Sequence, residues 1–529
     1  MKNLKFRIVA LSMVLLFASS CIDDLNTKPK VEQTLESILE NDPNAVLGLL
    51  SKIYGAYALS GPTGPDSKDI EGEDAGETAF LRGIINLQDF TADGLKNRWG
   101  DNGLDQLTTA SNWSPNNKFF RYLYDRVYYT VPNCNNLISA LNSTNIAGKE
   151  EYIAELRFLR SLAYYYMIDC FGKGVIVTEE DLGSLVPKQQ STRAEMFDYV
   201  ESELLSVESI LPLTSTYGRA NKSVARMLLA KLYLNAKVYS GEERYNDAAI
   251  YIKKVIDEGN FSLATNFVSV FSGDNNTSPE IIFPIIADPI VSRSYGNATY
   301  LINGSISADT MTPSIYGING NGWQGHRATK AWYGLFGASP QELEASSDVR
   351  AHLFWSNYLS SNPDKRHSYE MNDYKKWTDG YPCVKFRSTN FNGPQTNTDF
   401  SGTDFPMFRL ADAYLMYAEC ALRGATSASL SQALGYVNDV RSRSNATVIS
   451  TGELTLDFIL DERARELNFE GHRRTDLIRF GKFTGDSYVW PWKGGIKEGV
   501  SISPNYNLFP IPTTALQANP NLTQNPGFN

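Results

Sequence analysis

The histidines of this 529-residue chain show no spacing that suits catalysis or metal binding. The chain has no H-E-x-x-H zinc motif, no G-x-S-x-G nucleophile motif and no Walker A loop. Carboxylates are plentiful, and the separation that defines a glycosidase pair is spatial, so a glycoside hydrolase stays open as a minor alternative. We expect no metal and no cofactor, since the histidines are dispersed at His326, His352, His367 and His472.

One glycine pattern matches a nucleotide-binding motif by its spacing. Gly320, Gly322 and Gly325 satisfy G-x-G-x-x-G within GINGNGWQG. Such a motif binds a dinucleotide when it follows a β-strand, whereas this one lies among Asn and Gly residues with no β-branched strand before it. We therefore expect a turn that presents Trp323.

An acidic stretch runs from Asp66 to Glu77. Its six carboxylates could bind calcium, but their spacing fits no recognised calcium loop. We therefore expect a solvated acidic loop.

Amphipathic segments of helical length must support these loops. Two stretches look like antiparallel helix pairs, residues 228–239 with 245–256 and residues 409–422 with 430–443. Their Tyr and Ala spacing resembles a degenerate tetratricopeptide unit, with unrelated helical hairpins as the alternative. We expect a mainly α fold, with helices over residues 31–59, 119–141, 150–171, 193–211, 223–239 and 245–258.

Two segments lack helical periodicity, residues 60–115 and 260–408. Both are rich in Gly and Asn and carry Trp and Tyr residues. An irregular stretch as long as the second is usually functional or contains short strands. We expect the functional loops within these two segments.

Composition and charge exclude several classes of protein. Hydrophobic residues make up 42% and charged residues 20%, with a mean hydropathy of −0.30, which excludes a membrane bundle and a disordered chain. With 49 basic and 59 acidic residues and no basic tract, the chain is not expected to bind nucleic acid. Aromatic residues, at 12%, exceed what a core needs and can form flat recognition surfaces.

The N-terminus has the parts of an export signal. Basic residues within 2–7 precede an apolar stretch, residues 8–18, that is too short to span a bilayer as a stable helix. Two serines and Cys21 follow, which resembles a bacterial lipobox whose cysteine is acylated. We predict a lipoprotein signal peptide over residues 1–20, a lipidated tether over 21–30 and a single domain over 31–529.

The remaining cysteines do not suggest zinc or disulfides. Cys134, Cys170 and Cys420 fall in apolar helical patterns, and neither they nor Cys383 form a C-x-x-C pair. We expect small buried side chains, with the redox state left open.

Charges alternate at helical spacing near the C-terminus. Glu462, Arg463 and Glu466 are followed by Arg473 and Arg479. We expect ion pairs that hold the last helices against the body, with an anion-binding arginine cluster as the alternative.

Several stretches resemble the SusD/RagB family, the surface glycan-binding lipoproteins of Bacteroidetes. They are FRLADAYLMYAEC at 408–420, DERARELNFEGHRRTDLIRFGKF at 461–483 and FPIPTTALQANPNLTQNPGF at 509–528. The lipobox with its CIDDLN continuation agrees, and YVWPWKGG, SYGNATY and NGW are similar to the starch-binding member of the family.

The resemblance implies a tetratricopeptide-like scaffold of four helix pairs with a glycan site built from loops, and no catalysis. It also implies a lipid-anchored protein on the outer-membrane surface. Such a protein acts as a lid on a SusC-like TonB-dependent transporter and delivers oligosaccharides to it.

The implied site is an arc of aromatic rings with polar residues beside it. A sugar ring stacks its apolar C–H face on Trp or Tyr, while its hydroxyls bond to Arg, Asn or Asp. The loop LKNRWGDN has one tryptophan where the family has two. The residues that match the arc are Arg82, Trp99, Tyr295 and Trp323, with Asp101 or Asn102 as the polar partner.

Starch or malto-oligosaccharides, that is α-glucans, are the expected ligands. Another polysaccharide or a host glycan is the first alternative, because the LKNRWGDN loop departs from the family pattern. A purely structural partner of the transporter is a further alternative, since each aromatic residue could instead anchor its own loop.

Overall fold

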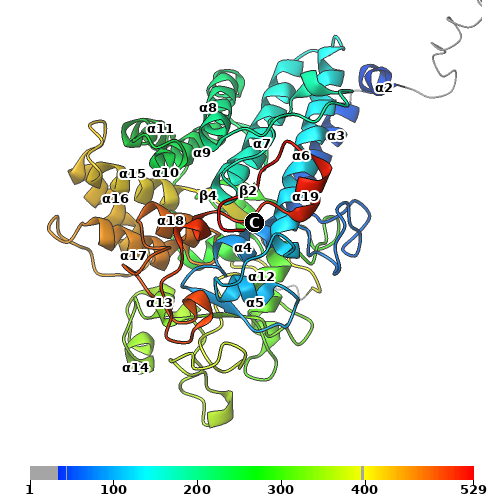
Figure 1. Ribbon diagram of the computed structural model, residues 1–529. Coiled ribbons are helices and arrows are strands. Elements are labelled where there is room, and N and C mark those ends of the chain that lie inside the picture. The colour runs from blue at the N-terminus through cyan, green and yellow to red at the C-terminus, as the bar shows by residue number, and fades with distance from the viewer. Residues whose placement is uncertain (1–33, 43, 395–397, 529) are drawn as a thin grey trace, which may run out of the picture.

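The computed structural model describes residues 34–42, 44–394 and 398–528, and most of its regular structure is helical (Figure 1). The helices are α2 (Leu35–Asn41), α3 (Ala45–Ala58), α4 (Phe80–Gln88), α5 (Leu104–Thr108), α6 (Lys118–Asn142), α7 (Lys149–Cys170), α8 (Arg193–Ile210), α9 (Lys222–Leu234), α10 (Ala236–Tyr239), α11 (Tyr245–Asp257), α12 (Ala298–Gly304), α13 (Lys330–Tyr333), α14 (Pro340–Glu344), α15 (Leu410–Leu422), α16 (Leu430–Arg443), α17 (Leu456–Leu467), α18 (Arg473–Arg479) and α19 (Thr513–Ala518). The strands are β1 (Leu95–Asn97), β2 (Ile281–Ile285), β3 (His326–Ala328) and β4 (Phe405–Arg409).

The molecule has a helical part and a loop-rich part. In Figure 1 the long helices α6 to α9, α11 and α15 to α17 lie together, and the loops with α5, α12, α13 and α14 lie below them. The predicted signal peptide and tether, with Cys21 and the boundary at residue 31, lie outside the described residues.

The predicted helix pairs are confirmed. α9 packs against α11, and α15 packs against α16, while α11 also packs against α15 and joins the two pairs. Tyrosines fill the crossings, since the rings of Tyr233 and Tyr251 lie 5.7 Å apart and those of Tyr414 and Tyr436 stack at 4.4 Å. The scaffold is therefore built from the residues whose spacing indicated it.

Two predicted helices are divided in the structure. The expected helix over 223–239 breaks at Asn235 into α9 and α10, and the one over 31–59 breaks into α2 and α3. Asp42 has an extended backbone, with φ −122° and ψ 104°, because the residue before a proline is disfavoured in a helix.

The segment 60–115 contains a helix that the sequence reading missed. All residues of α4, from Phe80 to Gln88, are buried. Helix α4 has only nine residues and carries Gly83 in its interior, so its sequence offers few helical turns and a weak helix propensity. The expectation of irregular structure was wrong here.

Short strands do occur in the segment 260–408. This was one of the two interpretations of so long a stretch without helical periodicity. β1 pairs antiparallel with β3, and β2 pairs antiparallel with β4. The first sheet joins the two loop segments, because Leu95 lies opposite Ala328 and Asn97 lies opposite His326. The residues that follow β1 therefore meet those that precede β3.

The acidic stretch is only partly solvated, which corrects the sequence expectation. Glu77 is buried and lies 2.8 Å from the Nζ of Lys118. Asp69 pairs with Arg126 at 2.8 Å. These carboxylates are held by internal cations and form part of the loop's structure.

The cysteine prediction is confirmed for burial. Cys134, Cys170, Cys383 and Cys420 are all buried and unpaired.

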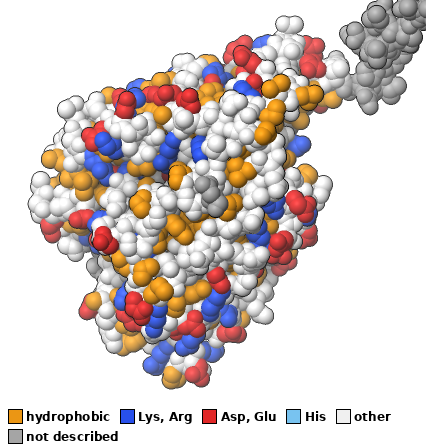
Figure 2. Space-filling model, in the orientation of Figure 1, with side chains coloured by type: hydrophobic (Ala, Val, Ile, Leu, Met, Phe, Trp, Pro, Cys, Tyr) orange, Lys and Arg blue, Asp and Glu red, His pale blue; other side chains and the backbone are white. Residues whose placement is uncertain are grey.

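Within the described ranges, no helix is both long enough and apolar enough to cross a membrane. Figure 2 shows basic and acidic side chains interspersed over the face in view, without a large basic patch.

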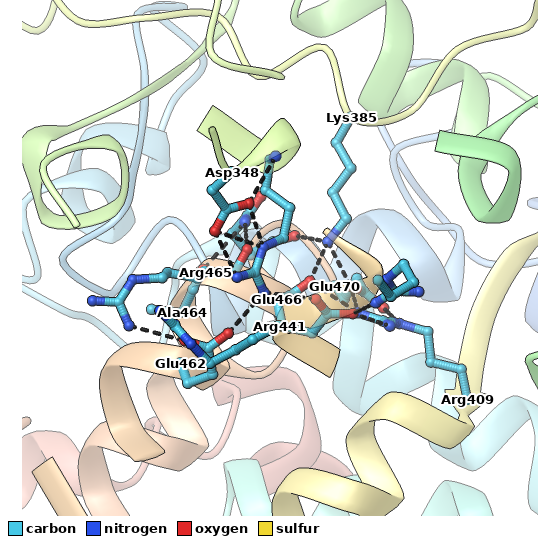
Figure 3. A network of polar contacts seen from close by, with 12 residues as sticks. Asp348, Lys385, Arg409, Arg441, Glu462, Ala464, Arg465, Glu466 and Glu470 are labelled. Carbon is cyan, nitrogen blue, oxygen red and sulfur yellow. Dashed lines mark hydrogen bonds and ion pairs between the residues drawn. The ribbon is translucent and has the colours of Figure 1, made fainter. Parts of the chain in front are cut away.

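The predicted ion pairs form a buried network that joins the two parts of the molecule (Figure 3). Glu466 on α17 accepts from Arg350 at 2.8 Å and from Arg409 at 2.7 Å, and it also pairs with Arg443. Lys385, from the loop-rich part, donates to the backbone oxygens of Glu466 at 2.9 Å and Asn468 at 2.8 Å. The side chains of Glu466 and its partners Arg350, Arg409 and Arg443, and that of Lys385, are all at least nine-tenths buried.

Replacing Arg409 with Met is expected to lower the free energy of unfolding by about 3–5 kcal/mol, because buried carboxylates lose a cation that compensates them. The measurement is urea denaturation. Arg366→Met, at an exposed arginine, is the matched control and should change stability by no more than about 0.5 kcal/mol. Equal stability of the two variants would contradict the role of the network.

The network also predicts acid sensitivity. Burial by itself raises the pKa of Glu466, but the charges of Arg443, Arg409 and Arg350 outweigh it and hold that pKa well below its usual range. A carboxyl whose folded pKa is depressed stabilises the fold above its unfolded pKa, about 4.3, and loses this contribution as the pH falls further. The urea midpoint should therefore begin to fall near pH 4.5, close to the unfolded pKa of a glutamate, and should keep falling to about pH 3. A constant midpoint would contradict it.

Candidate functional site

The β1–β3 pairing brings Trp99 and Trp323 together. Trp99 follows β1, and its indole Nε1 donates to the backbone oxygen of Trp323 at 2.8 Å. The backbone N–H of Arg98 donates to the oxygen of Gly325 at 3.2 Å. Residues more than 200 positions apart in sequence thus share one surface.

Three predicted aromatic residues form a continuous row. The ring centroids of Trp99 and Trp323 lie 6.4 Å apart with planes at 54°, and those of Trp323 and Tyr295 lie 6.1 Å apart with planes at 49°. All three rings are half-buried and keep exposed surface. We call Trp99, Trp323 and Tyr295 the aromatic arc.

A layer of buried side chains supports the arc. The ring of His326 lies 5.1 Å from that of Trp99, and the ring of Tyr300 lies 5.9 Å from it. Burial lowers the pKa of His326 to about 3, so the imidazole is neutral at physiological pH. Its Nδ1 lies 3.0 Å from the amide nitrogen of Asn97 and its Nε2 lies 3.2 Å from the oxygen of Tyr300, which fits a proton on Nε2. His326 therefore packs against Trp99 as a neutral ring.

A polar cluster lies behind Tyr300. The guanidinium of Arg82 on α4 lies 4.6 Å from the centre of the Tyr300 ring, and Glu77 lies 4.0 Å from Arg82. The buried Nε of Arg82 has no hydrogen-bond partner among the described residues. Burial raises the pKa of Asp101, against the nearby charges of Arg82 and Lys118. Arg82 and Asp101 thus lie close to each other and to the ring that supports the arc.

Asn102 differs from the other predicted residues. It is exposed in the turn before α5, and its side chain makes no hydrogen bond to another described residue. Asp101 is half-buried, and its backbone oxygen accepts from Leu104 at 3.0 Å. Of the two alternatives for the polar partner, Asp101 is the one whose pKa the charge of Arg82 affects.

The sequence reading missed two aromatic neighbours of the arc. Phe400 extends the row beyond Tyr295, at 4.9 Å between ring centroids, and Tyr300 lies under Trp99. Tyr300 belongs to SYGNATY, the motif that pointed to Tyr295, and could have been found there. Phe400 has no local motif, because only the fold brings it to Tyr295.

The glycine motif forms a turn, as predicted. β3 begins after the motif, no helix opens within it, and Gly322 has φ +75°. The backbone N–H of Trp323 donates to the oxygen of Asn303 at 2.6 Å, which fixes the turn that presents the indole.

No group of three or more His, Cys, Asp or Glu side chains in the described part of the chain could hold a metal ion.

Comparison with family models gives two matches. Residues 279–528 match the model described as "SusD family". Residues 85–234 match the model described as "Starch-binding associating with outer membrane". The two matches cover both the loop-rich part and the helical part.

Known proteins of the same kind resemble the whole chain. The "Starch-binding protein SusD" of Bacteroides thetaiotaomicron is 32% identical, and the alignment covers 96% of each chain. A SusD superfamily protein from Parabacteroides distasonis has a TM-score of 0.71 at 20% identity, over 92% of this chain and 99% of that one. Surface glycan-binding protein A from Bacteroides thetaiotaomicron, solved in complex with laminarihexaose, has a TM-score of 0.67 at 20% identity, over 91% and 98%.

Gly325→Ala is expected to disturb the arc. A Cβ at this position would lie 2.5 Å from the Cζ2 of Trp99, a ring confined by Tyr300 and His326. Such overpacking costs about 1–3 kcal/mol of stability and should also shift the tryptophan fluorescence. Urea denaturation followed by emission measures both.

Gly320→Ala is the matched control within the same motif. A Cβ there meets no atom within 4 Å, so stability should stay within about 0.5 kcal/mol of the wild-type value. A stable Gly325→Ala protein with unchanged emission would mean that Trp99 is free to move.

Proposed function

Because this chain belongs to the SusD family of non-catalytic carbohydrate-binding proteins, we propose that it captures an α-glucan of the starch type and delivers it to a SusC-like TonB-dependent transporter. Surface glycan binding in association with the outer membrane follows from the family. The starch ligand and the transporter are the proposed part.

The aromatic arc is the observation that carries the proposal. Trp99, Trp323 and Tyr295 offer ring faces on a surface whose backbone is held by strand pairing and by the Trp99–Trp323 hydrogen bond. Sugar rings stack on such faces through their C–H groups. Because the rings are held in place before binding, the ligand loses little affinity to ordering of the protein.

The shape of the arc supports a curved glycan. Successive rings are tilted by 54° and 49°, so the stacking surface turns along its length. The helical chain of an α-1,4-glucan suits a surface that is not flat better than a straight β-1,4-linked chain does. The relative named as starch-binding also supports an α-glucan.

A different helical glucan is the second candidate. The structural relative in complex with laminarihexaose shows that a similar fold holds a β-1,3-glucan, which is also curved. The single tryptophan of LKNRWGDN leaves one stacking position fewer than the family pattern has. A binding screen with amylopectin, malto-oligosaccharides, laminarin, dextran, levan and mucin glycans separates the candidates.

We propose that Arg82 and Asp101 complete the site beside the rings. The unpaired Nε of Arg82 can donate to a sugar oxygen after a small side-chain movement, and the carboxylate of Asp101 can accept from hydroxyls. Exposed Asn102 adds an amide at the same turn.

Anchoring by lipid at Cys21 would hold this site at the outer surface. Several acyl chains on one cysteine give firm attachment, and a short polar tether separates them from the body. A captured oligosaccharide then stays close to the transporter that imports it.

Trp323→Ala and Tyr295→Ala are expected to weaken glycan binding by about 10-fold or more, since each removes one stacking face of the arc. Affinity electrophoresis in amylopectin gels and calorimetry with maltoheptaose measure the loss. The melting temperature should stay nearly unchanged, because both rings are half-buried in loops.

Tyr152→Ala is the control for loss of a half-buried tyrosine on the scaffold helix α7. It should bind like the wild-type protein. Intact binding by Trp323→Ala, with a large fall in melting temperature, would show that the ring only anchors its loop. Binding of no glycan by the wild-type protein would leave the structural-partner alternative.

A further inference from the structure

A cavity lined by aromatic side chains lies in the loop-rich part, apart from the aromatic arc. It has a volume of about 280 Å³ and lies between α14 and the segment that follows the 3₁₀ helix Val349–Leu353. Figure 1 shows α14 below the long helices, among the loops. Three of its lining residues are aromatic and come from one short stretch, Phe354, Trp355 and Tyr358.

The backbone of this stretch is fixed. The N–H of Trp355 donates to the oxygen of Pro382 at 2.8 Å, and the oxygen of Ser356 accepts from His367 at 2.9 Å. Asn357 has a left-handed backbone with φ +48°, and its side chain donates to the oxygen of Lys365 at 2.9 Å. The aromatic residues are thus positioned without a ligand.

Polar groups at the cavity keep unused hydrogen-bonding capacity. Tyr358 Oη accepts from Gln341 at 2.6 Å and still has its own proton to donate. His352 Nε2 lies 3.0 Å from the oxygen of Ser346, so Nε2 donates there and Nδ1 is left as an acceptor. Glu344 is exposed and its carboxylate has no partner among the described residues.

This mixture of groups fits a sugar ring. Each sugar hydroxyl both donates and accepts, and the cavity offers both functions beside aromatic faces. Leu359 lies at the rim and is 75% exposed. Covering this apolar side chain with a ligand would be favourable, because apolar surface is removed from water. A volume of about 280 Å³ accommodates one or two pyranose rings, but it is too small for a helix or strand of another protein.

One short segment connects this cavity to the aromatic arc. Asn357 Nδ2 donates to the oxygen of Thr310 at 3.3 Å. Gln324, next to Trp323, donates to the side chain of Ser307 at 2.5 Å. Residues 307–310 therefore bond to both sites, which lie on neighbouring loops.

We propose that the cavity beside α14 is a second glycan subsite, which binds pyranose rings of the polymer that the aromatic arc holds. The inference rests on the proposed function. Two subsites on one chain hold a polymer by avidity, since binding at one raises the effective concentration at the other. An oligosaccharide that is too short to reach both subsites gains no affinity from the second one.

Tyr358→Ala tests the inference. Its apparent affinity for amylopectin in affinity gels should fall by about 10-fold, because one of two linked subsites is lost. Its affinity for maltoheptaose in calorimetry should stay within about twofold of wild type, since the arc is intact. Tyr358→Phe keeps the ring and should retain most of the polymer binding.

Combination with the arc variant separates this inference from the proposed function. Trp323→Ala should keep weak retardation by amylopectin, and Trp323→Ala/Tyr358→Ala should lose it. Tyr152→Ala controls for tyrosine loss, and unchanged melting temperatures exclude misfolding as the cause.

Wild-type behaviour of Tyr358→Ala toward amylopectin, together with loss of all binding in Trp323→Ala, overturns the second subsite and leaves the proposed function standing. A wild-type protein that binds neither amylopectin nor laminarin overturns both. Equal loss of maltoheptaose and amylopectin binding in Tyr358→Ala would assign Tyr358 to the arc itself and also overturn a separate subsite.

Discussion

The buried ion-pair network around Glu466 is the interaction on which the rest of the structure depends. Charges removed from water are costly unless each one finds a partner, so the network forms only when all of its elements are in place. Arg409 comes from β4, Arg443 from α16 and Glu466 from α17, while Arg350 and Lys385 come from the loop-rich part. The helical scaffold and the loops are thereby held in one fixed relation.

That fixed relation allows loops to carry a recognition surface. Aromatic rings bind sugars well only if they do not collapse onto each other or reorder on binding. Here the β1–β3 pairing sets the distance between Trp99 and Trp323, and His326 and Tyr300 fill the space behind them. The arc is held by these contacts although it lies outside the long helices, and hydrogen bonds likewise hold the segment that lines the cavity beside α14.

The arrangement suits capture followed by release. The arc is an open surface of half-buried rings. Under the proposed function each stacking contact would contribute modestly, so affinity would come from several contacts made at once.

The sequence by itself determined the helix pairs, the buried cysteines, the ion-paired C-terminal helices and, through family motifs, the residues of the arc. These depend on local period or on long motifs, as with Tyr233 and Tyr251 at the helix crossing. Only the tertiary structure decided that α4 is a helix, since a nine-residue segment with an internal glycine depends on burial more than on its local propensity. It alone placed Phe400 beside Tyr295, and Phe354, Trp355 and Tyr358 around a cavity, because contacts between distant segments follow from chain topology and leave no local pattern.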